Sequence, residues 1–194
     1  MNVLIDAAIA VQRVLNDAGI EFCFIGGFAA QRHAEPRVTR DVDLAVLTGL
    51  GNESRVIDVL MGAFPARRSD ARAFAERYRV LLLQTPAGVG IDATLTALPF
   101  EAEMIARSSS FEFAQGVYLR TCSAEDLLIM KIFAGRPIDW RDVEMVLRRY
   151  RPEQLDLAAV KLAVAPLLAA KDDTESMSEF ERLLMKVRSS RPPP

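Results

Sequence analysis

Along the first two thirds of the chain, segments in which apolar residues recur at helical spacing are interleaved with short apolar segments typical of strands. The spacing of three to four residues predicts helices over Val3–Asp17, Phe28–His33, Ser54–Phe64 and Pro99–Ala106. Apolar, β-branched runs predict strands over Phe22–Ile25, Asp41–Leu47, Arg79–Thr85 and Val89–Leu95, and a hairpin over Phe111–Thr121. Pro86-Ala87-Gly88 joins the third and fourth strands as a second hairpin.

From Ser123 onward the pattern is helical only. Ser123 and Asp126 form a capping-box signal, and Gly135 stops the helix that begins there. Further helices are expected over Pro137–Tyr150, over Glu153–Ala170, which Pro166 kinks or divides, and over Glu175–Arg188. The sequence thus predicts an α+β protein: a mixed α/β part over residues 1–122 and a C-terminal helical region over residues 123–190.

Composition and charge narrow the class of protein. The 194 residues are 51% hydrophobic and carry a net charge of -2, so no overall field favours nucleic acid. Cys23 and Cys122 are too few and too far apart for a disulfide framework or a zinc site, and each lies in an apolar run. Neither a signal peptide nor an apolar run of membrane-spanning length is present. We therefore expect a soluble, cytoplasmic protein without membrane contact.

Two acidic residues begin the Asp41–Leu47 strand. Side chains at i and i+2 point to the same face of a strand, so Asp41 and Asp43 present their oxygens side by side. Such a pair repels itself unless a cation lies between its members, and Mg²⁺ favours one or two carboxylates together with phosphate oxygens. A divalent metal site is one interpretation, and a solvated strand end is the other.

Two further features accompany this pair. Gly26-Gly27 links a strand to a helix, where bare backbone and outward amides favour a phosphate; a tight turn without a ligand is the alternative. Asp92 lies within an apolar β-type run, where an unpartnered carboxylate is costly to bury. A strand beside that of Asp41 would bring all three carboxylates together, with Asp92 as a further metal ligand or a base; otherwise Asp92 points to solvent.

The Gly-Gly-x-Ala turn, the Arg37-x-Thr39-x-Asp41-x-Asp43 strand and the later Asp92 resemble the polymerase-β-type nucleotidyltransferase superfamily. Within it the chain is most similar to the minimal bacterial transferases around the AbiEii-type toxins. The resemblance implies the nucleotidyltransferase fold, a small mixed sheet flanked by helices. It also implies NTP as substrate and Mg²⁺ or Mn²⁺ on Asp41, Asp43 and Asp92.

The same resemblance assigns several other residues. Gly26 and Gly27 would contact the triphosphate, and Lys131 would be a cation that meets it, a surface lysine being the alternative. Beside them, Arg37 is either a phosphate contact or a balance for the acidic charges, and Thr39 could bond backbone groups at the start of the strand. An ion-pair network at a helix junction is expected from three residues that follow Lys131 in the chain, Arg136, Asp139 and Asp142. The single histidine, His33, is expected to be packed or to face solvent, and the single tryptophan, Trp140, is expected to be a packing residue.

These observations lead to a metal-dependent nucleotidyltransferase that moves NMP from NTP to an acceptor hydroxyl. If the toxin resemblance holds, the acceptor is a macromolecule, tRNA or protein, and an antitoxin partner is expected. One alternative is transfer to a small molecule of the aminoglycoside kind, for which Glu175, Glu179 and Glu181 would form an acidic cleft. The other is a non-catalytic nucleotide-binding or interaction protein of the same fold.

Overall fold

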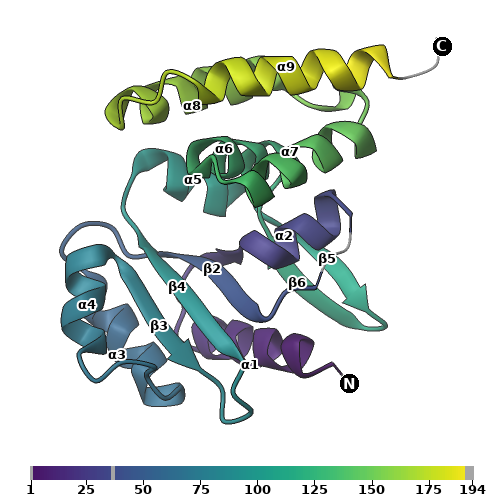
Figure 1. Cartoon of the computed structure of the whole chain (residues 1–194). Helices are drawn as coiled ribbons and strands as arrows, with labels where there is room; N and C mark the ends of the chain where they lie inside the picture. The colour runs from purple at the N-terminus through teal and green to yellow at the C-terminus, as the bar shows by residue number, and fades with distance from the viewer. Residues whose placement is uncertain (1, 36–37, 191–194) are drawn as a thin grey trace. The chain divides into compact units, whose positions relative to one another are not determined.

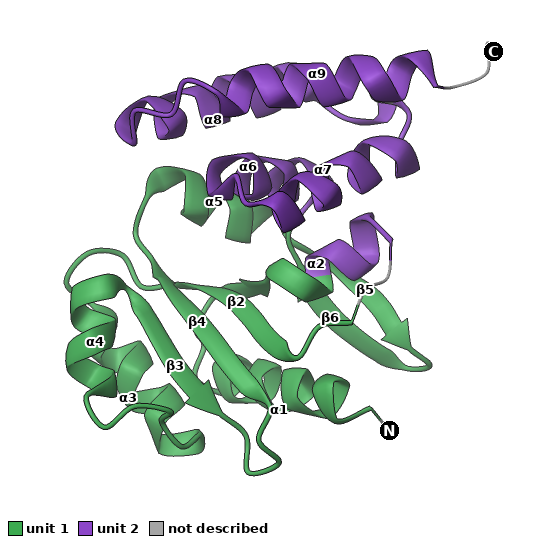
Figure 2. Cartoon of the chain, in the orientation of Figure 1, with its two compact units in different colours: residues 1–28, 37–122 green, residues 29–36, 123–194 purple. Residues whose placement is uncertain are grey.

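The computed structural model of the chain describes residues 2–35 and 38–190 (Figure 1). The chain forms two compact units, one of residues 1–28 and 37–122 and the other of residues 29–36 and 123–194 (Figure 2). A short segment before the predicted boundary near Cys122 thus belongs with the C-terminal helices. Two hydrogen bonds explain this grouping: His33 Nδ1 lies 2.7 Å from the Tyr150 hydroxyl, and Arg149 Nη1 donates to the Ala34 carbonyl at 3.4 Å.

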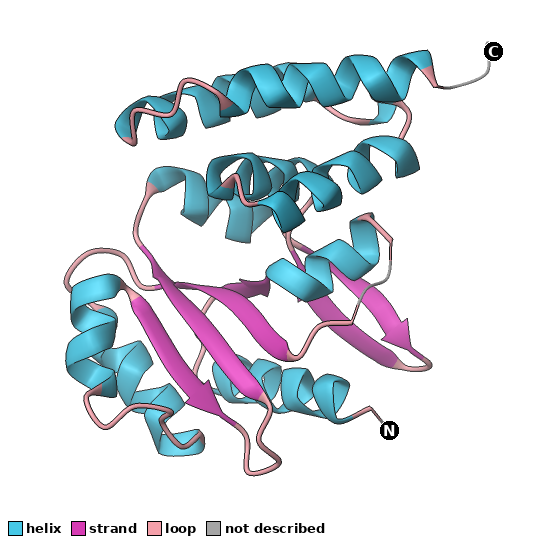
Figure 3. Ribbon diagram, in the orientation of Figure 1, coloured by secondary structure: helices cyan, strands magenta, loops and turns pink. Residues whose placement is uncertain are grey.

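A mixed sheet is the framework of the first unit (Figure 3). Its strand order is β3-β4-β2-β1-β6-β5. The strands are β1 (Phe22–Phe24), β2 (Asp41–Leu47), β3 (Val80–Gln84), β4 (Gly90–Thr96), β5 (Ser109–Ala114) and β6 (Val117–Thr121). β2 runs parallel to β4 and β1 runs parallel to β6, whereas the remaining neighbours are antiparallel. The predicted fold class and both predicted hairpins are confirmed.

One face of this sheet is covered by α1 (Val3–Asp17), α3 (Glu53–Ala63) and α4 (Ala71–Tyr78). The apolar stripe of α1 and alternate residues of the strands share one hydrophobic cluster, in which Val42 and Leu44 of β2 are fully buried. The Asn2 side chain caps α1 by accepting from the amide of Leu4 at 3.0 Å. Because strand side chains alternate, burial of Val42 and Leu44 on this face directs Asp41 and Asp43 to the other.

The remaining helices of this part of the chain differ in detail from the sequence predictions. α2 (Gly26–His33) begins at the glycine pair itself rather than at Phe28, and α5 (Pro99–Arg107) packs against β2. α4 was not predicted, because it is a short and mostly polar segment whose only buried positions are the small residues Ala71 and Ala75.

The second unit contains α6 (Ala124–Ala134), α7 (Pro137–Arg149), a 3₁₀ turn (Pro152–Gln154), α8 (Leu157–Ala170) and α9 (Ser176–Ser189). Ser123 Oγ accepts from the amide of Asp126 at 3.1 Å, and Gly135 ends α6 with a φ of 66°. Both were expected from the sequence. Pro166 lies inside α8, which continues as one helix and is not divided. Within the described residues no helix is long and apolar enough to cross a membrane.

A buried ion cluster joins α6 to α7. Lys131 Nζ donates to Asp139 Oδ1 at 2.7 Å and lies 2.8 Å from Asp142 Oδ2, and both carboxylates are almost fully buried. Arg136 Nε donates to Asp139 Oδ2 at 2.6 Å. Burial opposes ionisation of Asp139, but the hydrogen bonds from Arg136 and Lys131 outweigh it and hold the pKa of Asp139 below its ordinary value. The predicted network at this junction is therefore present, and Lys131 is at its centre.

Replacing Lys131 by Met should destabilise the protein strongly, because it leaves two buried carboxylates without their shared cation. We expect a loss of about 3–5 kcal/mol in the free energy of unfolding, measured by urea denaturation. Lys161, which pairs with Glu181 at 2.7 Å on the surface of the same unit, is the matched control. Lys161→Met should cost less than about 1 kcal/mol. Equal effects of the two substitutions would contradict a stabilising role for the buried cluster.

Candidate active site

Three carboxylates lie on the face of the sheet opposite the hydrophobic core. In the parallel pairing of β2 with β4, Asp43 lies directly beside Asp92, and Asp41 lies beside Gly90. Residues that are paired in this way point to the same face, and neighbouring strands are separated by about 4.8 Å. The prediction that the Asp92 strand lies beside the Asp41 strand is confirmed. All three side chains are only partly buried and can be reached from solvent.

The glycine turn lies against the second of these carboxylates. Gly26 has a φ of 50°, and a Cβ added there would overlap Asp43 Oδ2. The amide of Gly27 donates to the same Oδ2 at 3.4 Å, and the amide of Ile25 donates to the Asp43 carbonyl at 3.0 Å. Glycine is therefore required at position 26 for two reasons, its backbone conformation and the space that Asp43 occupies.

The second glycine makes room for Thr39, since a Cβ on Gly27 would overlap the Thr39 hydroxyl. That hydroxyl donates to the Asp41 carbonyl at 3.4 Å, so Thr39 bonds to the backbone at the start of β2. Phe28, the next residue of α2, is fully buried and packs against Phe24 and Phe113 at ring distances of 5.4 and 5.3 Å. Arg37, the other residue predicted to lie near the phosphates, is outside the described residues.

Arg67 is a member of this site that sequence reasoning missed. Its guanidinium forms an ion pair with Asp92 through Nη2 and Oδ1. Burial raises the pKa of Asp92 above its ordinary value, and the nearby Asp41 charge adds to this effect while Arg67 opposes it. The run Pro65-Ala66-Arg67-Arg68 has no periodicity, so nothing in the sequence distinguishes Arg67 from its neighbour Arg68.

The donor set is suited to a hard divalent cation, because all candidate ligands are carboxylate oxygens that line one accessible face. The three carboxylates do not all surround one cation position, however. Within residues 2–35 and 38–190, no three His, Cys, Asp or Glu side chains lie close enough together to hold a metal ion. The geometry therefore fits a cation on Asp41 and Asp43, with Asp92 paired to Arg67 instead.

Lys131 belongs to the second unit, where its ammonium contacts Asp139 and Asp142. Its predicted contact with a triphosphate stays a prediction. His33 is buried beside Tyr150, so of its two expected placements, packed or solvent-facing, the structure has the packed one.

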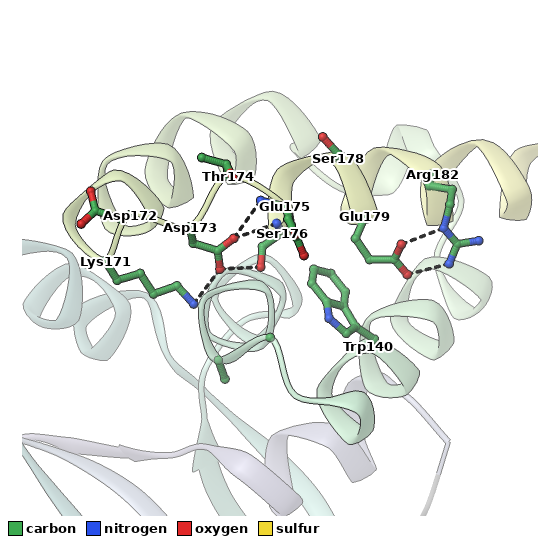
Figure 4. Close-up of a pocket in the computed structure, with 12 residues that line it drawn as sticks. Trp140, Lys171, Asp172, Asp173, Thr174, Glu175, Ser176, Ser178, Glu179 and Arg182 are labelled. Atoms are coloured by element: carbon green, nitrogen blue, oxygen red, sulfur yellow. Dashed lines mark hydrogen bonds and ion pairs between the residues drawn. The ribbon is translucent and has the colours of Figure 1, made fainter.

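The second unit contains an open cavity of about 780 Å³ along the start of α9 (Figure 4). Trp140, Glu175 and Glu179 line it, and their side chains border the same space. Asp173 in its wall accepts from Lys171 and Ser176, which together hold the pKa of Asp173 well below its usual range. Of the three acidic residues proposed to form a cleft, Glu175 and Glu179 lie here, whereas Glu181 pairs with Lys161.

Comparison with known protein families identifies the family of the chain. The model of the family described as "Nucleotidyl transferase AbiEii toxin, Type IV TA system" matches residues 9–191. No curated protein sequence is significantly similar to the chain.

Among solved structures, an antigenic nucleotidyltransferase-like protein from Paracoccidioides brasiliensis has the same fold. Its TM-score is 0.51 and its sequence identity is 17%, and the match covers 90% of each chain. The antibiotic-resistance factor ANT(2'')-Ia matches with a TM-score of 0.47 and 16% identity, over 95% of this chain and 91% of that one.

The family match extends over nearly the whole sequence and confirms the resemblance that was inferred from the glycine turn and the carboxylates. The chain is a nucleotidyltransferase and belongs to the AbiEii toxin family.

Proposed function

We propose that the chain transfers a nucleoside monophosphate from an NTP to an acceptor hydroxyl, with Mg²⁺ or Mn²⁺ held by Asp41 and Asp43. The observation that carries this proposal is the register of β2 against β4, which sets Asp41, Asp43 and Asp92 on one accessible face beside the Gly26-Gly27 turn. The cation would neutralise phosphate charge as the bond to pyrophosphate breaks.

The chain's own groups have distinct tasks in this proposal. The turn at Gly26 and Gly27 begins α2 beside Asp43, and the positive end of this helix would attract a triphosphate bound to the cation. The acceptor oxygen attacks the α-phosphorus while the bond to the pyrophosphate oxygen breaks, and the proton of the hydroxyl is released. Asp92 lies one strand away from Asp43 and is either a further ligand or the base that receives this proton. Positioning and charge neutralisation provide most of the rate enhancement.

The family description supports an antitoxin partner, and the macromolecular acceptor is a further part of our proposal. Its members are described as toxins of a type IV toxin–antitoxin system, so we propose tRNA or a protein as acceptor and an antitoxin as partner. One observation favours a second candidate, a small cationic acceptor of the aminoglycoside kind. The cavity of the second unit combines the carboxylate of Glu175 with the aromatic face of Trp140, which attracts cations, while Glu179 in the same wall is paired with Arg182.

The proposal predicts metal-dependent label transfer that needs both carboxylates of β2. Purified protein is incubated with each α-³²P-labelled NTP, Mg²⁺ or Mn²⁺, and either total RNA, total cell protein or an aminoglycoside. The double variant Asp41→Asn/Asp43→Asn should lower transfer by about a hundredfold or more, because the negative charges that hold the cation are lost. Asp58→Asn is the control, since Asp58 is an exposed residue of α3 that pairs with Arg72 of α4.

The acceptor that becomes labelled separates the two candidates. Label on RNA or protein supports a macromolecular acceptor, and label on the aminoglycoside supports a small cationic acceptor. Absence of transfer to any acceptor, or equal transfer by the double variant, would overturn the proposed reaction. In that case NTP binding without metal dependence would leave a non-catalytic nucleotide-binding protein.

The space above Gly90 gives a second, independent test of the site. Gly90 has an ordinary backbone conformation, but a Cβ added there would overlap Asp41 Oδ1. Gly90→Ala should therefore displace Asp41 and weaken Mn²⁺ binding about tenfold, as measured by the loss of the free Mn²⁺ signal in electron paramagnetic resonance. Gly62→Ala is the matched control, because nothing lies within 4 Å of the added atom. This control should bind Mn²⁺ normally and gain up to about 1 kcal/mol of stability as a helical glycine replacement. Unchanged Mn²⁺ affinity in Gly90→Ala would argue against Asp41 as a ligand.

A further inference from the structure

Arg67 is held beside the carboxylates by its backbone and not merely by its side chain. The amide of Arg67 donates to the Leu82 carbonyl at 3.0 Å, and the amide of Gln84 donates to the Pro65 carbonyl at 2.9 Å. An isolated bridge between Ala66 and Leu83 lies between these bonds. The short segment 65–67 therefore continues the sheet beyond β3, and Arg67 has a fixed place in it.

The alternation of side chains decides the face to which Arg67 points. Ala66 is paired with Leu83 and packs against the hydrophobic core, so Arg67 points to the opposite face. On that face Leu82 lies beside Asp92 in the pairing of β3 with β4. The guanidinium reaches Asp92 across Leu82, which places a positive charge beside this carboxylate.

The guanidinium also lies close to Asp41. A Cβ built on Gly90 would have Arg67 Nη1 at 3.2 Å and would overlap Asp41 Oδ1, so both groups border the space left by this glycine. Side-chain exposures of 30% for Arg67 and 36% for Asp92 show that the ion pair is partly shielded from water. Its charge therefore acts on a cation site with less screening than a surface charge would.

We propose that Arg67 is a positioning residue of the nucleotidyl-transfer site, which holds the Asp92 carboxylate and lowers the affinity of the site for a divalent cation in the absence of substrate. This inference rests on the proposed function, because it presumes the cation on Asp41 and Asp43. The Arg67 guanidinium balances the negative charge of Asp92, which a metal cation would otherwise balance. All three carboxylates can share one cation only when Arg67 has moved away from Asp92. The phosphate oxygens of a bound substrate offer the guanidinium an alternative partner, because guanidinium groups bind phosphate with two parallel hydrogen bonds.

The sign of the effect distinguishes this role from a structural one. A group that merely supports the site would weaken cation binding when it is removed, because the ligands would lose their arrangement. A competing positive charge would strengthen cation binding when it is removed. The two roles therefore predict opposite changes in Mn²⁺ affinity for the same substitution.

The experiment is a Mn²⁺ titration of the purified full chain without nucleotide, followed by electron paramagnetic resonance. Arg67→Gln should bind Mn²⁺ about tenfold more tightly than the unmodified chain, the size expected for loss of one charge near a divalent cation. Arg67→Lys, which keeps the charge, should stay within about threefold of the unmodified chain. Arg68→Gln is the matched control: Arg68 is the next residue, pairs with Asp70 and lies over the Phe74 ring, so its loss should leave the affinity unchanged.

Coupling to Asp92 completes the test. In an Asp92→Asn background, Arg67→Gln should raise the affinity by less than it does alone, because only the direct repulsion of the cation is removed and no carboxylate is released. Thermal unfolding followed by circular dichroism checks that each variant folds, and Arg67→Ala is a second variant if Arg67→Gln does not.

Three outcomes would overturn the inference. If the unmodified chain binds Mn²⁺ and Arg67→Gln binds it equally or more weakly, Arg67 has no competing role and the proposed function stands. If the gain persists in full without Asp92, Arg67 does not act through that carboxylate. If neither the unmodified chain nor Arg67→Gln binds Mn²⁺, the cation site of the proposed function fails together with this inference.

Discussion

The parallel pairing of β2 with β4 is the constraint on which the candidate active site depends. It sets Asp43 beside Asp92 and sends Asp41 to the same face, while Val42 and Leu44 enter the core. A shift of one residue in this register would bury the carboxylates and expose the apolar side chains, at a large cost in free energy. The burial of one face thus fixes the chemistry of the other.

Charge pairing is the second theme of the structure. On the accessible face of the sheet Arg67 neutralises Asp92, and between α6 and α7 Lys131 neutralises Asp139 and Asp142. The two cases differ in burial. The cluster around Lys131 is almost fully buried, so breaking it leaves uncompensated buried charge. The pair at Asp92 is open to solvent on one side, which allows its partner to be exchanged for a ligand.

Most elements of the fold could be predicted from local patterns. The strong periodicity of α1, the alternation in β2 and the capping signal at Ser123 correspond to elements whose apolar residues are large and regularly spaced. α4 could not be predicted, because its buried residues are alanines that carry little hydrophobic signal. Pro166 did not divide α8, because proline preferences are overridden where tertiary packing holds the helix.

Local sequence patterns specify the chemical elements of the site: a glycine turn, two carboxylates on one strand face and a third carboxylate in an apolar strand. Spacing along one strand is a local property, so the pairing of Asp41 with Asp43 needs no knowledge of the fold. The placement of Asp92 beside Asp43 and the contact of Arg67 with Asp92 arise from the folded sheet, since both depend on which strands are neighbours. Contacts between segments that are far apart in the chain follow from strand order and register, and no local pattern specifies these.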